Sequence, residues 1–150
     1  MKKLITILFV TINVCFSQNL KSVATKPFNI DWQQKVTDIL LEKALGAPDT
    51  MNILQKIENV NYIYSNGINC YFIIKEDGFI LYSIEMTAGE YQGIKTGMSK
   101  RKVIKYFGQP DERISSKNMT IMDWNYGEKY IITAKFQKGK LYNLSINKNI

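Results

Sequence analysis

The sequence predicts an α+β fold built of two tandem repeats, and three observations support this prediction. The string Gly-Ala-Pro-Asp at 46–49 returns as Gly-Gln-Pro-Asp at 108–111, an offset of 62 residues. Apolar positions on both sides keep this offset, which is typical of an internal duplication. In both places a run with helical spacing precedes the string and strand-like runs follow it. We therefore expect each repeat to be a helical segment followed by a three-stranded antiparallel meander, with both helices packed on one face of a shared curved sheet.

Each repeat is expected to begin with a helix that ends at the recurring string. Asp31 and Ser99 are the expected N-caps. The glycine of each string can adopt the positive φ of a helix C-terminus, and the proline two places later cannot continue a helix. The string therefore predicts a helix end. The apolar residues at helical spacing are Val36, Ile39, Leu40 and Ala44 in the first repeat and Val103, Ile104 and Phe107 in the second.

Three strands are expected after each helix, separated by turns that contain glycine. They fall near 60–64, 69–75 and 79–86 in the first repeat, and near 120–126, 129–136 and 140–146 in the second. The repeats are predicted to cover residues 18–88 and 89–150. The constant offset pairs Tyr62 with Trp124, Tyr64 with Tyr126, and Phe79, Tyr82 and Ile84 with Leu141, Leu144 and Ile146.

Residues 1–17 have the pattern of a secretory signal peptide. Two lysines are followed by an apolar run from Leu4 to Val14 and then by small or polar residues. This run is short for a membrane span, and the small-residue rule places cleavage after Ser17. The alternative is a lipid anchor on Cys15, although Asn13 and Val14 stand where a lipobox has small residues. We expect an exported protein, periplasmic or secreted, with the lipid-anchored form as the alternative.

The mature chain that this cleavage predicts is basic and poor in catalytic residue types. Removal of residues 1–17 takes two lysines, so the formal net charge falls from +7 to +5. The chain has no histidine, which excludes His-dependent zinc sites and nucleophile–His pairs. Cys70 lies in a strand-like apolar run, which favours a buried side chain over a nucleophile.

The remaining acidic residues do not form a recognisable catalytic pattern. The adjacent pairs Glu76–Asp77 and Asp111–Glu112 fall in expected turns, where neighbouring side chains seldom converge on one substrate atom. The isolated glycines fit turns and caps rather than a phosphate-binding loop, and no calcium-loop spacing is present. We expect no catalytic residues, no cofactor and no metal site.

Lys100, Arg101 and Lys102 form the first candidate binding site. They occupy the first turn of the second predicted helix, where the helix dipole disfavours positive charge. A locally unfavourable choice of this kind can mark a site for an anionic partner. The alternative is an ordinary solvated helix surface, because the electrostatic cost is only tenths of a kcal/mol.

Four aromatic residues form the second candidate site. Tyr62 and Tyr64 alternate along one expected strand, and Trp124 and Tyr126 alternate along another, so we expect all four to share a sheet face. If that face meets the helices, the four side chains belong to the core. If it is the open face, they form an aromatic strip suited to a protein partner.

These motifs resemble those of the SmpA/OmlA (BamE-like) module and of the small domains of the beta-lactamase-inhibitor protein. The resemblance rests on GIKTGMSKRKVIKYFGQPD, WNY and KFQKGKLYNLSI, within residues 93–146. Residues 31–86 match more loosely and lack the Gly-Met step. The resemblance implies tandem αβ units that share a sheet in an exported, non-catalytic protein that binds other proteins.

The expected function is therefore that of a non-catalytic exported binding protein whose partner is another protein or an anionic envelope component. An exported location argues against nucleic acid, and the mature chain is expected to have no transmembrane span. Two alternatives remain open. One is an envelope scaffold anchored through a lipid on Cys15, and the other is a secreted enzyme with an unrecognised site around Cys70 or the turn carboxylates.

Overall fold

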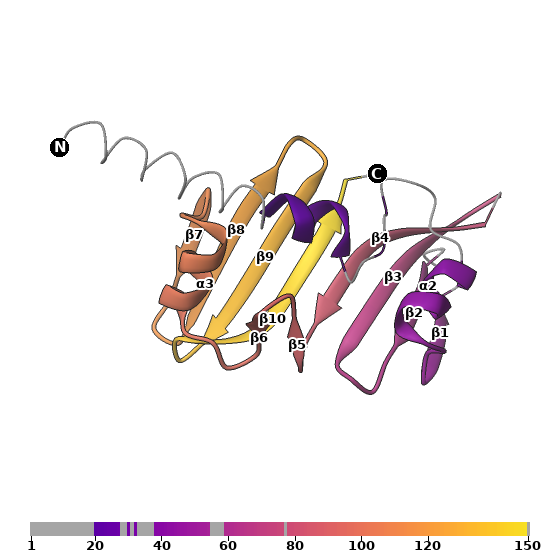
Figure 1. Cartoon of the computed structure of the whole chain (residues 1–150), viewed down its shortest axis with the longest axis horizontal. Coiled ribbons are helices and arrows are strands. Elements are labelled where there is room, and N and C mark those ends of the chain that lie inside the picture. The colour runs from indigo at the N-terminus through magenta and orange to yellow at the C-terminus, as the bar shows by residue number, and fades with distance from the viewer. Residues whose placement is uncertain are drawn as a thin grey trace.

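One eight-stranded antiparallel sheet dominates the computed structural model, which describes residues 20–27, 30, 32, 38–54, 59–76 and 78–149 (Figure 1). The strand order is β1-β2-β3-β4-β10-β9-β8-β7, and β5 and β6 form a separate two-stranded hairpin. The strands are β1 (Thr50–Leu54), β2 (Asn59–Ile63), β3 (Ile68–Lys75), β4 (Gly78–Met86), β5 (Glu90–Tyr91), β6 (Ile94–Lys95), β7 (Glu112–Ser115), β8 (Met119–Tyr126), β9 (Tyr130–Gln137) and β10 (Lys140–Lys148).

The predicted fold, two tandem repeats of a helical segment and a three-stranded meander with the helices packed on a shared sheet, is wrong. The described chain is mainly one large sheet, and its helices α2 (Asp38–Leu45) and α3 (Lys100–Phe107) have only eight residues each. Strands β1 and β7 were not expected. Because the described side chains of both edge strands are exposed, neither strand has the alternation of buried and exposed positions that reveals a strand in sequence.

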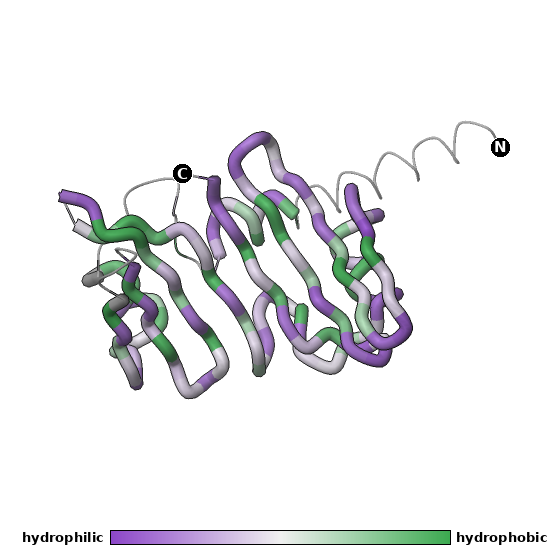
Figure 2. The backbone as a smooth tube through the Cα atoms, turned by 180° about the vertical axis from the view of Figure 1, so that it is seen from behind, coloured by the Kyte–Doolittle hydropathy of each residue, from purple (hydrophilic) through white to green (hydrophobic). Residues whose placement is uncertain are grey.

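The two faces of the sheet differ in what covers them. In Figure 1, α2, α3 and a helical segment at 20–25 lie in front of the strands. Seen from behind in Figure 2, the strands are uncovered, and hydrophilic and hydrophobic residues alternate along them. We call these the helix-bearing face and the open face. The helix-bearing face carries the core, including Val60, Cys70, Phe72, Ile84, Met86, Met122, Trp124, Ile132, Phe136, Leu144 and Ile146.

The predicted helix ends at the recurring string are confirmed. Helix α2 stops before Gly46 and α3 stops before Gly108, with φ values of 82° and 90°. Ser99 is the N-cap residue of α3, although its side chain makes no capping hydrogen bond. The expected cap at Asp31 lies outside the described residues. A positive φ favours glycine, which explains why this residue type closes both helices.

The aspartate of each string has a second role that its turn position does not reveal. Asp49 Oδ2 accepts a hydrogen bond from the Ser65 N–H, and Asp111 Oδ2 accepts one from the Asn125 N–H, both at 2.6 Å. The residue before each N–H is a buried aromatic, Tyr64 in one case and Trp124 in the other. Ser65 and Asn125 therefore occupy equivalent positions, and they are 60 residues apart rather than 62. At this offset Trp124 corresponds to Tyr64, so the predicted correspondence of Trp124 with Tyr62 is wrong.

Two β-bulges change the register further along the chain. In β4, Tyr82 has no partner on β3, because Leu81 pairs with Phe72 and Ser83 with Tyr71. In β10, Tyr142 has no partner on β9, because the register shifts between Leu141 and Asn143. A bulge places two residues opposite one and breaks the alternation of faces. The predicted pairing of Tyr82 with Leu144 is consequently wrong, because Leu144 is buried in the core whereas the Tyr82 ring lies beside Tyr71 on the open face.

We expect Asp111→Ala to lower the free energy of unfolding by about 1 kcal/mol, the usual net value of one such hydrogen bond. The change leaves the Asn125 N–H without its acceptor, as the geometry above implies. Urea unfolding checks the value. The neighbouring Glu112→Ala on exposed β7 is the control and should change stability by less than about 0.5 kcal/mol. Equal effects of the two substitutions would contradict the role given to Asp111.

Candidate functional site

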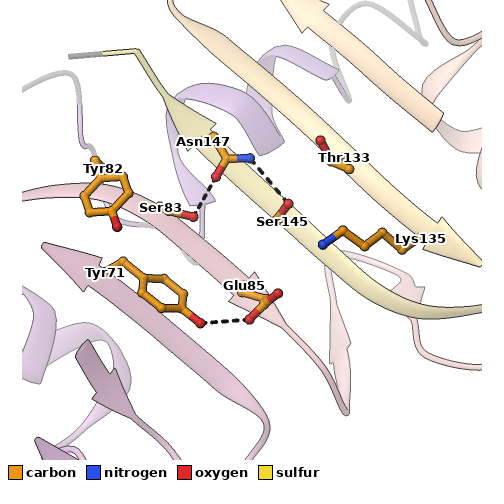
Figure 3. Close-up of a pocket in the computed structure, with 8 residues that line it drawn as sticks. All are labelled: Tyr71, Tyr82, Ser83, Glu85, Thr133, Lys135, Ser145 and Asn147. Atoms are coloured by element: carbon orange, nitrogen blue, oxygen red, sulfur yellow. Dashed lines mark hydrogen bonds between the residues drawn. The ribbon is translucent and has the colours of Figure 1, made fainter. Parts of the chain in front are cut away.

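A polar hollow of about 370 Å³ lies on the open face, where the four central strands run side by side. Strands β3 and β4 line one side of it, and β9 and β10 line the other (Figure 3). The hollow crosses the β4–β10 pairing, which joins the N-terminal and C-terminal strands of the sheet. Its lining residues are Tyr71, Tyr82, Ser83, Glu85, Thr133, Lys135, Ser145 and Asn147.

Glu85 is held at the rim of this hollow by two neutral donors. Tyr71 Oη donates to Glu85 Oε2 at 2.9 Å, and Asn143 Nδ2 donates to Glu85 Oε1 at 2.5 Å. The three residues come from adjacent strands β3, β4 and β10. Because each carboxylate oxygen accepts a hydrogen bond, the Glu85 side chain is held in a fixed position.

The Tyr71 phenol remains protonated across the physiological range. Burial, followed by the hydrogen bond to Glu85 and the charge of that carboxylate, raises the pKa of Tyr71 to about 12. A neutral phenol keeps its O–H as a donor to Glu85. The Tyr82 ring lies 6.4 Å from the Tyr71 ring, so that two tyrosines border one side of the hollow.

Asn147 connects β4 and β10 at the other end of the hollow. Ser83 Oγ donates to Asn147 Oδ1 at 2.7 Å, and Asn147 Nδ2 lies 3.4 Å from Ser145 Oγ (Figure 3). Ser83 is buried although it faces the open side of the sheet. These contacts give the floor of the hollow a fixed pattern of donors and acceptors on rigid strands.

Lys135 supplies the positive charge of the hollow. It lies on β9 opposite Asn143, and its side chain points toward β10 in Figure 3. Within the part of the chain that the structure describes, no hydrogen bond or ion pair engages its ammonium group. One ammonium and one carboxylate line the hollow, which therefore has no net charge.

Three further polar atoms on the open face are buried and lack a hydrogen-bond partner among the described residues. They are the Oδ1 atoms of Asn61 on β2, Asp123 on β8 and Asn143 on β10. Buried acceptors of this kind are usually satisfied by protein groups or by ordered water.

The predicted aromatic strip does not lie on this surface. Tyr62 and Tyr64 are each 4% exposed and Trp124 is 1% exposed, all on the helix-bearing face, and half-buried Tyr126 packs against Tyr130. Trp124 Nε1 donates to the Gly108 carbonyl oxygen at 3.0 Å, and its ring lies 5.2 Å from Phe107. The sequence left open whether these aromatics belong to the core or form a strip on the open face, and the structure places them in the core or packed against it.

The predicted basic cluster lies at the start of α3 and contributes nothing to the hollow. Arg101 and Lys102 are exposed. Lys100 is half-buried, and its Nζ lies 3.4 Å from Oγ1 of Thr120, a buried residue of β8. The structure therefore separates the two predicted groups of binding residues from the polar hollow.

Cys70 is buried, as the sequence predicts. Burial raises the pKa of its thiol to about 12, so the nucleophilic thiolate is not formed near neutral pH. Of the turn carboxylates, Asp111 is held by the Asn125 N–H, Glu76 and Glu112 are exposed, and Asp77 lies outside the described residues. Across the described ranges, no three residues among His, Cys, Asp and Glu lie close enough together to hold a metal ion.

The residues of the hollow were missed because their arrangement depends on strand order and on the bulges. The alternation in YNLSIN does indicate that Asn143, Ser145 and Asn147 share a face. Nothing in the sequence, however, shows that β4 pairs with β10, which brings Glu85 next to Ser145. This long-range pairing is the information that local patterns lack.

The chain is similar in fold to a DUF4309 family protein (YjgB) from Bacillus subtilis subsp. subtilis str. 168. The TM-score is 0.50 and the sequence identity 10%, and the match covers 88% of this chain and 99% of that chain. An extracellular protein containing a SCP domain from Bacillus anthracis str. Ames matches with a TM-score of 0.47 and 8% identity, over 77% of this chain and 44% of that chain.

No protein-family model matches the sequence, and no curated protein matches it significantly. The likeness to YjgB concerns the fold alone. Neither solved structure bears the name of the SmpA/OmlA family or of the beta-lactamase-inhibitor protein, so that resemblance stays a prediction. No helix within the described ranges combines the length and the apolar character that a membrane crossing requires.

We expect the stability of the protein to fall as pH rises from about 10 to about 12, and Tyr71→Phe to reduce this fall. The unfolded chain releases the Tyr71 proton near pH 10 and the folded chain near 12, so the unfolded state is favoured progressively within this window. Urea unfolding at about pH 9 and about pH 11 measures the difference.

Thr133→Val is the matched control for Tyr71→Phe, because it changes the same hollow without removing a titratable group. Its loss of stability between the two pH values should equal that of the wild type. Cys70, whose pKa is also raised, contributes equally to all three proteins. If Tyr71→Phe and wild type lose stability in parallel, the raised pKa of Tyr71 is contradicted.

Proposed function

We propose that this chain is an exported, non-catalytic binding protein that holds a polar partner against the open face of its sheet. The observation that supports this most directly is the hollow lined by eight residues from four central strands. The helix-bearing face is occupied by the core, whereas the open face presents fixed polar groups. A surface of this kind has its hydrogen-bonding groups positioned before a partner arrives, which lowers the entropic cost of binding.

The chemistry of the hollow favours binding over catalysis. Glu85 already accepts hydrogen bonds at both oxygens, and the raised pKa of Tyr71 keeps its phenol from acting as a base. A nucleophile needs an activating base as its neighbour. The chain contains no histidine to serve as that neighbour, and Cys70 lies in the core on the other face.

A protein surface is the partner that best suits this face. The hollow is shallow and neutral overall, and it combines two tyrosines with amide, hydroxyl, carboxylate and ammonium groups. Tyrosine contributes large contact area at low conformational cost, and hydrogen-bonding groups around it provide specificity. An anionic envelope component is the second candidate, because Arg101 and Lys102 are exposed at the start of α3.

Export is the part of the proposal that rests on residues 1–17, which lie outside the described residues. The order of lysines, apolar run and small residues supports a cleaved signal peptide ending at Ser17. In this proposal the mature protein acts in the periplasm or outside the cell, and a lipid anchor on Cys15 is the alternative.

We expect Ser145→Trp to abolish partner binding while the protein remains folded. Ser145 lies at the floor of the hollow, and an indole there would block access from the open face. Affinity capture from the envelope fraction of the native cells, followed by mass spectrometry, compares the retained proteins. Circular dichroism checks that the variant keeps its sheet.

The matched comparison is a charge reversal at Lys100, Arg101 and Lys102, which lie away from the hollow. We expect this triple variant to retain the partners that Ser145→Trp loses. The opposite pattern, with partners lost only on charge reversal, would assign binding to the basic start of α3. Retention of every partner by Ser145→Trp would refute the proposed role of the open face.

The intact mass of the mature protein tests the export proposal. We expect a chain that begins at Gln18, because cleavage after Ser17 satisfies the small-residue rule. A mass that corresponds to a chain beginning with diacylated Cys15 would establish the lipid anchor instead. An uncleaved mass in the native cell would contradict both forms of export.

A further inference from the structure

Strand β1 is an edge of the sheet, and among the residues that the structure describes no further strand pairs with its outer side. It pairs with β2 on one side and ends the strand order on the other. Natural proteins usually protect such edges with charge, proline, a bulge or a very short strand. The β1 sequence Thr-Met-Asn-Ile-Leu contains no charge and no proline, and its register with β2 is continuous over five residues. The opposite edge, β7, has four residues, two of which are charged, Glu112 and Arg113.

Two apolar side chains of β1 are exposed at this edge of the sheet. Met51 is 50% exposed and Ile53 is 54% exposed. Met51 is paired with Tyr62 and Ile53 with Val60, and both partners are buried under the helix-bearing face. Residues that pair directly across strands share a face, so Met51 and Ile53 extend the apolar surface of the core to the edge of the sheet.

We propose that β1 binds β1 of a second copy of this chain, in an antiparallel pair centred on Asn52. This arrangement pairs all five residues of the strand and places Met51 of each copy opposite Ile53 of the other. A two-fold axis perpendicular to the sheet keeps the helix-bearing faces on the same side. The exposed Met51 and Ile53 side chains of the two copies then form one cluster and remove each other from water.

A second copy suits this edge because the strand is uncharged and its two exposed apolar residues, Met51 and Ile53, lie symmetrically about Asn52. The chain carries a formal net charge of +7, or +5 after loss of residues 1–17, so two copies repel each other where their lysines meet. Strand β1 contributes no charge to that repulsion. The register centred on Asn52 also brings amide opposite amide on the open face.

A small pocket next to β1 supports the same arrangement. It has a volume of about 250 Å³ and is lined by Glu42, Ala47, Pro48, Met51, Tyr62 and Tyr64. Since Ile53 of the second copy lies opposite Met51, its side chain is placed at the rim of this pocket. In strand addition, main-chain hydrogen bonds supply affinity and pockets for alternate side chains supply specificity.

Sedimentation velocity over a concentration series, on the full chain, tests the proposal. We expect a reversible monomer–dimer equilibrium, and an increase of about tenfold or more in the dimer dissociation constant for Ile53→Lys. The matched control is Ile114→Lys on the other edge, where Ile114 is 65% exposed. This control should dimerise like the wild type. A wild type that is monomeric at every concentration, or equal weakening by the two lysines, would overturn the proposal.

Disulfide trapping keeps the proposal testable if Ile53→Lys fails to fold. In a Cys15→Ser background, Asn52→Cys places two thiols across the two-fold axis, where the Cα separation of an antiparallel pair lies within disulfide range. We expect a cross-linked dimer under mild oxidation, and none for Ile114→Cys. Buried Cys70 does not compete. Absence of the Asn52→Cys dimer, or an equal yield from Ile114→Cys, would also overturn the proposal, whichever result the open-face experiments give.

Discussion

The pairing of β4 with β10 is the interaction on which the rest of the structure depends. Four residue pairs, from Met86↔Leu144 to Ser83↔Asn147, are what join strands β1–β4 to β7–β10. On the helix-bearing face this pairing brings Ile84 next to Ile146 in the core. On the open face it brings Glu85 within reach of Asn143. One strand pairing thus unites the core and creates the polar hollow.

The two bulges decide which tyrosines can meet a partner. In a strand without a bulge, successive residues point to opposite faces. Buried Leu81 in β4 and buried Leu141 in β10 would then each be followed by one open-face residue and next by another core residue. The extra residue in each strand adds Tyr82 and Tyr142 to the open face instead. Bulges are common beside functional sites because they redirect a side chain without altering the remainder of the strand.

Local features of this fold could be predicted from sequence, whereas its long-range features could not. Gly46 and Gly108 revealed the helix ends because positive φ has a strong residue preference. The burial of Cys70 followed from its apolar neighbours. The predicted match of Tyr62 with Trp124 was wrong because the offset between the two halves of the chain changes from 62 at Asp49 and Asp111 to 60 at Ser65 and Asn125. A change of two residues preserves the alternation of apolar positions, so the sequence pattern does not reveal it. The hollow was missed because its residues, from Tyr71 to Asn147, meet only through strand pairings that local periodicity does not encode.

The same residue types serve opposite purposes on the two faces, and the environment decides which. Tyr64 and Trp124 lie beneath the helices, where their area stabilises the core. Tyr71 and Tyr82 lie on the open face. There the hydroxyl group of Tyr71 donates a hydrogen bond that orients Glu85, and the two aromatic rings border the hollow. A count of aromatics therefore says little about binding in a sheet protein. Alternation, bulges and helix cover together determine which aromatics a partner can reach. Here they leave Tyr71 and Tyr82 on the open face, and neither belongs to the four aromatics that the sequence predicted as a binding strip.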